Sequence, residues 1–159
     1  MGVVTDSRRR FLVVPGSLKI PVPFEFAFPH GALFRGVQKA VDFDLRGKQG
    51  DDQARDKETG ERIWSVTLLD LDPDAARFGR DLVKVKLIAP VMPVAPVSPV
   101  PGYPPAVALE GLVLVPWVDD GRCKGGPSCR ARLAYSMRAT GLVPAEIAVP
   151  DSPEPAVAV

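Results

Sequence analysis

Residues 83–87 read Val83-Lys84-Val85-Lys86-Leu87, an unbroken alternation of apolar and basic side chains. Strict alternation predicts a half-buried β-strand, because successive side chains of a strand point to opposite faces. Two further stretches with this pattern precede it, at residues 33–43 and 64–68. Two stretches rich in apolar residues follow it, at residues 109–118 and 130–140. The sequence therefore predicts a mainly β protein with five strands.

One short helix is predicted between the second and third strands. Asp72 suits the N-cap, Pro73 suits the first helical position, and Gly79 would end the helix after about two turns. Asp70, Asp72 and Asp74 could instead bind a metal ion. No EF-hand spacing follows them, so we favour capping.

Proline dominates residues 90–105, which hold seven of the 18 prolines of the chain. Pro90, Pro93, Pro96 and Pro99 recur at every third position. This spacing favours an extended polyproline II segment and excludes a helix or a central strand. We interpret residues 90–105 as a stiff connector, called the strap, between the third and fourth strands. A ligand for a proline-binding domain is the alternative.

Five strands, one short helix and long polar loops predict a single small barrel of the oligonucleotide-binding (OB) type. We assign residues 21–143 to this barrel. Residues 1–20 are expected to form a flexible basic arm, and residues 144–159 a flexible acidic tail rich in proline and alanine. The usual helix of an OB barrel lies between strands three and four, where this chain has the strap.

The charge of the chain is balanced overall but unevenly distributed. Its 159 residues include 20 basic and 19 acidic residues, which gives a net charge of +1. Residues 1–30 sum to +2, with arginines at 8–10, residues 119–140 sum to +3, and residues 141–159 sum to −3. A surface that binds nucleic acid must therefore be local.

The composition excludes several classes of protein. No apolar run reaches the roughly 18 residues of a membrane helix, and no hydrophobic signal-peptide region follows residues 1–10. Two cysteines do not make a disulfide framework, so a reducing cytoplasm is the expected location.

The sequence predicts no catalytic or metal-binding constellation. His30 is the only histidine, and together with Cys123 and Cys129 it makes too sparse a set for zinc. The two cysteines lie in a Gly/Pro loop and could close an incidental disulfide. No stretch fits a phosphate-binding loop. We expect a protein that is not an enzyme and that needs no metal or cofactor.

Basic residues gather in and beside two of the predicted loops. In OB barrels the loop between strands one and two and the loop between strands four and five flank the binding groove. The candidate nucleic-acid-binding residues are Arg46, Lys48, Arg55, Lys57, Arg62, Arg122, Lys124, Arg130, Arg132 and Arg138. Acidic residues make the first loop neutral overall, and a solvated hairpin is the alternative interpretation there.

Aromatic side chains are interleaved with these basic residues and could stack on bases. The candidates are Phe34, Phe43, Trp64, Trp117 and Tyr135. Trp64 and Tyr135 share the apolar faces of their strands, which favours a place in the core for both. Arg132 and Arg138 point to the other face of the last strand and are the better candidates for phosphate contacts.

Several short strings follow one another in a fixed order. They are Phe28-Pro29-His30-Gly31-Ala32, RDKETG at 55–60, Trp64-Ser65-Val66, VKVK at 83–86, Glu110-Gly111-Leu112, Pro116-Trp117-Val118 and RLAYSMRA at 132–139. This succession, over roughly residues 20–143, resembles the actinobacterial plasmid replication, integration and excision activators of the Pra-type family. The resemblance implies a role in switching an integrated mobile element to its excising, replicating state. It implies no catalytic residues.

We therefore expect a cytoplasmic, non-enzymatic activator that acts through DNA, with single-stranded DNA as one option. Its expected protein partners are the replication initiator, excisionase or integrase of the element. The alternative is an adaptor that docks on the initiator or on the transcription machinery without touching DNA. A helix-turn-helix activator is disfavoured, because the only predicted helix is too short for recognition. The sequence predicts no oligomeric state.

Overall fold

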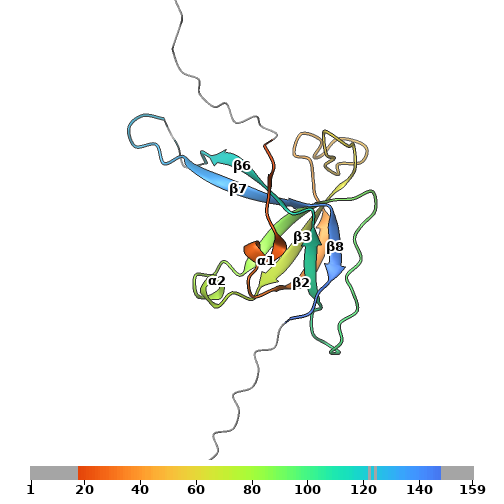
Figure 1. Cartoon of the computed structure of the whole chain (residues 1–159). Helices are drawn as coiled ribbons and strands as arrows, with labels where there is room; N and C mark the ends of the chain where they lie inside the picture. The colour runs from red at the N-terminus through yellow and green to blue at the C-terminus, as the bar shows by residue number, and fades with distance from the viewer. Residues whose placement is uncertain (1–17, 122, 124, 148–159) are drawn as a thin grey trace, which may run out of the picture.

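The structure is a computed structural model that describes residues 18–121, 123 and 125–147 (Figure 1). The protein is mainly β, with eight strands in one sheet of order β1-β6-β7-β4-β3-β2-β5-β8. The arginines at 8–10 and most of the acidic tail lie outside the described residues. No helix in the described ranges is long and apolar enough to cross a membrane.

The elements follow one another along the chain with a proline-rich gap before β5. They are β1 (Ile20–Pro21), α1 (Phe24–Ala27), β2 (Ala32–Lys39), β3 (Ile63–Asp70), α2 (Pro73–Arg77), β4 (Leu82–Ile88), β5 (Ala106–Glu110), β6 (Val113–Asp119), β7 (Arg132–Ala139) and β8 (Gly141–Pro144).

Strands β2, β3 and β4 form an antiparallel meander whose inner face is the centre of the core. Val66, Val85 and Leu87 are almost completely buried, whereas Lys84 and Lys86 are exposed on the outer face. The alternation predicted for residues 83–87 is therefore confirmed. The predicted core position of Trp64 is confirmed as well, because its ring is buried and its Nε1–H donates to the carbonyl oxygen of Ala89 at 3.0 Å.

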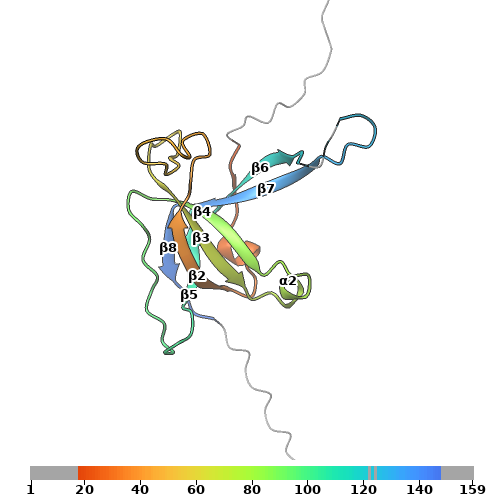
Figure 2. The same cartoon turned by 180° about the vertical axis from the view of Figure 1, so that it is seen from behind.

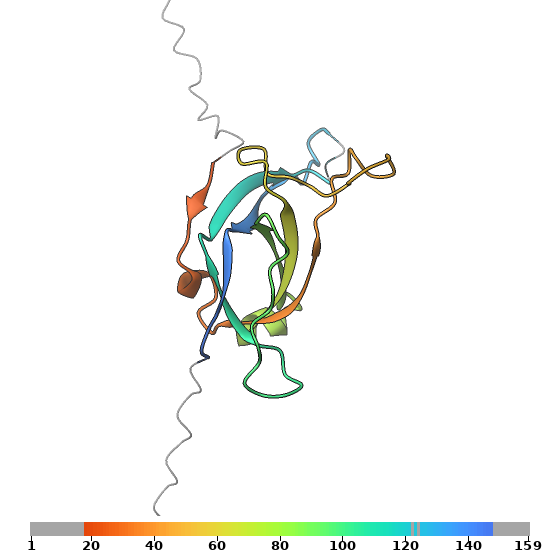
Figure 3. The same cartoon turned by 90° about the vertical axis from the view of Figure 1, so that its right-hand side faces the viewer.

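The predicted fourth and fifth strands are each divided in two, so the prediction of a five-stranded barrel is wrong. The strands are interrupted at Gly111 and at Thr140, which separates β5 from β6 and β7 from β8. Gly111 has a φ of +60°, which favours glycine, and a Cβ atom there would collide with the side chain of Thr140. The long hairpin therefore bends sharply, and the sheet curls into a half-barrel (Figure 3).

The bend places the two halves of this hairpin at opposite ends of the sheet. One half, β5 and β8, joins the meander through antiparallel pairing of β5 with β2. The other half, β6 and β7, joins it through parallel pairing of β7 with β4, which is confined to Val85–Leu87 and Met137–Ala139. Beyond this point residues 115–119 and 132–136 continue as a two-stranded ribbon. We call this ribbon the projecting arm (Figures 1 and 2).

The two short helices are stabilised by different interactions. α2 begins as predicted, because the Asp72 carboxylate accepts a hydrogen bond from the backbone N–H of Asp74 at 2.9 Å. β1 and α1 were not predicted, and α1 has no capping side chain. Tertiary packing supports α1: the ring of Phe24 stacks on the buried ring of Phe28 with centroids 5.1 Å apart. The strap contains neither helix nor strand and connects β4 to β5, as predicted.

Replacement of Gly111 tests the role of the bend. Gly111→Ala places a Cβ atom at a positive φ and against Thr140, so we expect the free energy of unfolding to fall by about 1–3 kcal/mol. Urea denaturation followed by tryptophan fluorescence measures this change. Gly36→Ala is the matched control, because Gly36 lies in β2 with open space around it. Equal losses in both variants would show that the bend does not depend on the glycine.

Candidate nucleic-acid interface

The loop between β2 and β3 (residues 40–62) overhangs the outer face of the sheet and encloses a groove of about 510 Å³. We call it the loop–sheet groove. Side chains of β4, β6 and β7 line it on one side and side chains of the loop on the other. The lining residues are Lys19, Val41, Asp42, Phe43, Asp44, Ala54, Arg55, Asp56, Lys57, Glu58, Ile63, Lys86, Val115 and Arg138.

Two cations lie side by side on the sheet side of this groove. Lys86 of β4 and Arg138 of β7 are register partners in the parallel ladder, so their side chains leave the same face of the sheet. Partial desolvation of Lys86 in the groove and the neighbouring charge of Arg138 lower the pKa of Lys86 below its usual value. The buried Nε of Arg138 has no hydrogen-bond partner within the described chain. The Nε–H of Arg138 is therefore left without an acceptor, as a donor in an anion-binding site is before its ligand arrives.

Among the residues that the structure describes, Asp56 is the one carboxylate in an ion pair with this pair of cations. It is 5% exposed, and its Oδ1 lies 3.6 Å from Nη1 of Arg138. Its Oδ2 accepts hydrogen bonds from the backbone N–H of Thr59 at 3.1 Å and from the Thr59 hydroxyl at 3.0 Å. Burial raises the pKa of Asp56, but the hydrogen bonds from Thr59, the positive charge of Lys19 and a backbone hydrogen bond from Glu58 together outweigh it, and the pKa lies below its usual value. Asp56 thus fixes the loop turn and holds Arg138.

The sequence analysis missed both Lys86 and Asp56 as site residues. Lys86 was interpreted only as the polar side of a strand, since the parallel pairing of β4 with β7 is invisible in the local pattern. For Asp56 a signal was present: the string Asp56-Lys57-Glu58-Thr59-Gly60 ends on a glycine with φ +73° and has the composition of a side-chain-capped turn.

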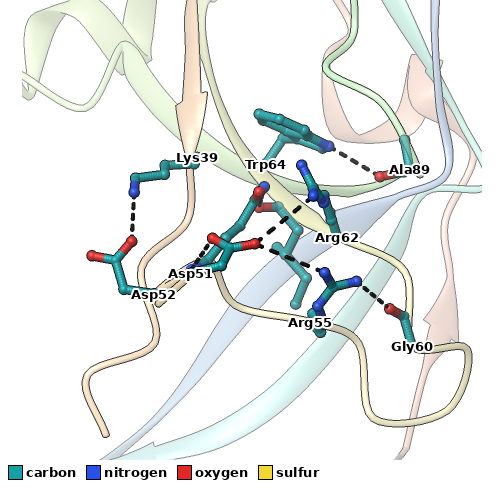
Figure 4. Close-up of polar contacts among 10 residues, drawn as sticks. Lys39, Asp51, Asp52, Arg55, Gly60, Arg62, Trp64 and Ala89 are labelled. Atoms are coloured by element: carbon teal, nitrogen blue, oxygen red, sulfur yellow. Dashed lines mark hydrogen bonds and ion pairs between the residues drawn. The ribbon is translucent and has the colours of Figure 1, made fainter. Parts of the chain in front are cut away.

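Two of the five predicted basic residues of the first loop are engaged within the loop itself. Arg55 and Arg62 share the carboxylate of Asp51, at 3.8 Å and 3.9 Å, and Arg55 also donates to the carbonyl oxygen of Gly60 at 3.2 Å (Figure 4). Arg55 and Lys57 line the loop–sheet groove. Arg46, Lys48 and Arg62 do not. Ion pairs between its own side chains therefore hold the first loop. This agrees with the alternative interpretation of the loop as a solvated hairpin.

Of the predicted residues of the second loop that the structure describes, Arg132 alone lies on the projecting arm. Arg122 and Lys124 lie outside the described residues. Arg130 is exposed between the disulfide-bonded Cys129 and β7. Arg132 begins β7, and its Nε donates to Oδ2 of Asp119 at 3.1 Å. Its side chain is nevertheless 72% exposed, so this pair leaves the guanidinium accessible.

The two faces of the projecting arm carry different side chains. By the register of β6 and β7, Trp117 shares the outer face with Arg132 and Arg138. Tyr135 lies on the opposite face, which continues the inner face of the sheet. The prediction that Tyr135 is in the core is wrong: it is 52% exposed, because the arm extends past the elements that cover the core. Trp117 is 49% exposed.

The remaining stacking candidates divide between the surface and the core. Phe43 is 81% exposed at the loop side of the groove, whereas Phe34 packs against the core. The outer face thus carries three cations and one aromatic ring between the groove and the arm. We call Lys86, Arg138, Trp117 and Arg132 the basic track. Arg132 and Arg138 are six positions apart along β7, which is about 20 Å.

The described residues contain no group of three histidine, cysteine or acidic side chains that could hold a metal ion. Cys123 and Cys129, considered above for zinc, are joined in a disulfide. Asp72 caps α2. Comparison of the chain with protein-family models, curated proteins and solved structures finds no match. The function must therefore be argued from the residues and their arrangement.

Replacement of Asp56 tests its role as the anchor of the groove. Asp56→Asn removes the charge that faces Arg138, so we expect a loss of about 1–3 kcal/mol in the free energy of unfolding at pH 7. A lowered carboxyl pKa stabilises the fold above the unfolded-state pKa of about 3.8, and this contribution is lost as the pH falls through the folded-state pKa. The difference between wild type and variant should therefore shrink below about pH 4 in urea titrations. A difference independent of pH would contradict this assignment.

Proposed function

We propose that this protein is a cytoplasmic, non-enzymatic activator of replication, integration and excision of an integrative mobile element that acts by binding DNA. The observation that carries the DNA-binding part is the pair Lys86 and Arg138 in the loop–sheet groove, with Trp117 and Arg132 on the same face. The biological role rests on the resemblance of the ordered strings to the Pra-type family.

The order of strand pairing supports an interrupted OB fold. If β5 with β6 and β7 with β8 are counted as two bent strands, the sheet has five strands in chain order. Their pairings are first–second, second–third, third–fifth, fifth–fourth and fourth–first. A five-stranded Greek-key barrel, partly open, is the arrangement of OB folds. The loop–sheet groove then lies where such folds bind oligonucleotides.

The chemistry of the basic track suits a flexible single strand. Stacking on an exposed indole tolerates any base, and cations spaced along a strand can follow a phosphate backbone. The carboxylates of the first loop keep the surface from attracting nucleic acid non-specifically. We therefore propose single-stranded DNA as the ligand.

The charge of Lys86 should affect binding and stability in opposite directions. Lys86→Gln removes one phosphate contact, so we expect affinity for a single-stranded oligonucleotide to fall about eightfold at 50 mM salt. The slope of log affinity against log salt should become shallower by about 0.7. Stability should stay unchanged or rise, because the fold disfavours the charged form of Lys86. Fluorescence anisotropy and urea denaturation measure the two effects.

Lys84→Gln is the matched control, because Lys84 is exposed on the same strand outside the groove. It should change affinity much less than Lys86→Gln. Equal effects of the two substitutions would assign the attraction to overall charge. Absence of binding by the wild type at low salt would reject the proposal itself.

A second pair of substitutions separates the two faces of the projecting arm. Trp117→Ala should weaken single-strand binding by about 1–3 kcal/mol, the usual contribution of one stacked base. Tyr135→Ala removes an equally exposed ring from the opposite face and should leave the affinity unchanged. Both variants can be compared by anisotropy at one salt concentration. A larger loss for Tyr135→Ala would place the ligand on the inner face.

Two apolar surfaces favour the adaptor function as a second candidate. Val118, Leu133 and Tyr135 are exposed on the inner face of the arm. Along the strap, Val91, Val94, Val97 and Val100 recur at every third position and are at least half exposed. Both could dock on a protein partner. Co-purification with the replication initiator of the element from nuclease-treated extract, together with no DNA binding by the pure protein, would select this function.

A further inference from the structure

The projecting arm receives little support from the rest of the fold. β1 pairs with β6 at Leu114 and Val113 and reaches no farther, and β4 pairs with β7 only from Met137 onward. Within the arm, Trp117, Val118, Leu133 and Tyr135 are all about half exposed or more. From Trp117 to the tip no described residue of this ribbon is buried, and a two-stranded ribbon without a buried face is marginally stable in water. Something other than core packing must keep the arm ordered.

A covalent bond closes the far end of this arm. Cys123 and Cys129 form a disulfide across the loop between β6 and β7, with Cα atoms 4.5 Å apart. A turn supports each cysteine: the Cys123 N–H donates to the carbonyl oxygen of Asp120 at 2.7 Å, and the Cys129 N–H donates to that of Gly126 at 3.1 Å. The disulfide thus joins the two strands beyond their last paired residues, Asp119 and Arg132.

We propose that the Cys123–Cys129 disulfide is a reversible, redox-sensitive clamp that orders the projecting arm. Among the described residues, the other cross-strand contacts near the tip are an exposed ion pair between Asp119 and Arg132, which adds little, and the backbone ladder. Closing a loop of this size covalently shifts the equilibrium between the ordered and frayed arm by about 50-fold on chain entropy alone. The clamp is therefore the largest single stabilising contribution at the tip.

The reaction at this site is thiol–disulfide exchange with a low-molecular-weight thiol. The thiolate attacks Sγ of Cys129, the more exposed cysteine, forms a mixed disulfide there and releases Cys123 as a thiolate that takes up a proton. A second thiol attacks the mixed disulfide and releases Cys129. One protein disulfide and two small thiols thus become two protein thiols and one small disulfide. A reducing cytoplasm favours the open form, and the reverse exchange, in which a low-molecular-weight disulfide is reduced to two thiols, restores the clamp.

The clamp itself does not depend on the proposed function, but its consequence for DNA does. Trp117 and Arg132 belong to the basic track and lie on the arm, whereas Lys86 and Arg138 lie on the sheet. Opening the clamp should therefore remove only the arm from the interface. On the proposed function, the oxidised protein binds single-stranded DNA more tightly than the reduced protein, and the groove keeps its residual affinity.

Hydrogen exchange of the full-length protein, with and without dithiothreitol, tests the clamp directly. We expect backbone amides of residues 115–119 and 132–136 to exchange about 50-fold faster after reduction, with those of Val66 and Val85 unchanged. The double substitution Cys123→Ser and Cys129→Ser should exchange like the reduced protein in either condition. Ser128→Ala, which keeps both cysteines, should respond to dithiothreitol like the wild type.

Two results would overturn the clamp. Arm amides that exchange at the same rate in the oxidised, reduced and doubly substituted proteins would show that the disulfide does not order the arm. Equal acceleration in the arm and at Val66 would show that it supports the whole fold. Oligonucleotide affinity measured on the same samples tests the interface separately. Faster arm exchange without a change in affinity would uphold the clamp and remove the arm from the proposed DNA-binding surface.

Discussion

The bend at Gly111 and Thr140 is the constraint on which the rest of the structure depends. It divides one long hairpin into two shorter ones and sends them to the two ends of the sheet, where they pair with β2 and β4. The same bend brings Arg138 beside Lys86 and directs residues 115–119 and 132–136 away from the core. The groove and the arm therefore both follow from a conformation that favours glycine at one position.

Local patterns predicted the meander and failed where distant segments meet. The alternation at residues 83–87, the capped α2 and the strap were all predictable, because each depends on neighbours in the sequence. The division of the last two strands was not, since it depends on Gly111 meeting Thr140. The exposure of Tyr135 was missed for a similar reason. Alternation assigns a side chain to one face of the strand, but it does not show how far the elements that bury this face extend along the strand.

The candidate site shows the same limit. Arg138 was selected from its strand alone, yet its neighbours Lys86 and Asp56 come from a parallel strand and a distant loop. Counting basic residues in the first loop overstated its attraction for phosphate, because Asp51 engages both Arg55 and Arg62. Charge summed over a segment therefore says less about an interface than the pairing of individual side chains does.

The parallel ladder between β4 and β7 also has a kinetic consequence. Val85 and Met137 are more than 50 residues apart in the chain, so this ladder forms only after a long loop has closed. The meander and the β6–β7 hairpin are made of nearer neighbours and can form first. Pairing β4 with β7 requires the two ends of the intervening chain, which includes the strap, to come together. Because the strap is rich in stiff prolines, it loses fewer backbone conformations in this step than a glycine-rich connector of equal length would. The strap thus lowers the entropic barrier to closing the sheet.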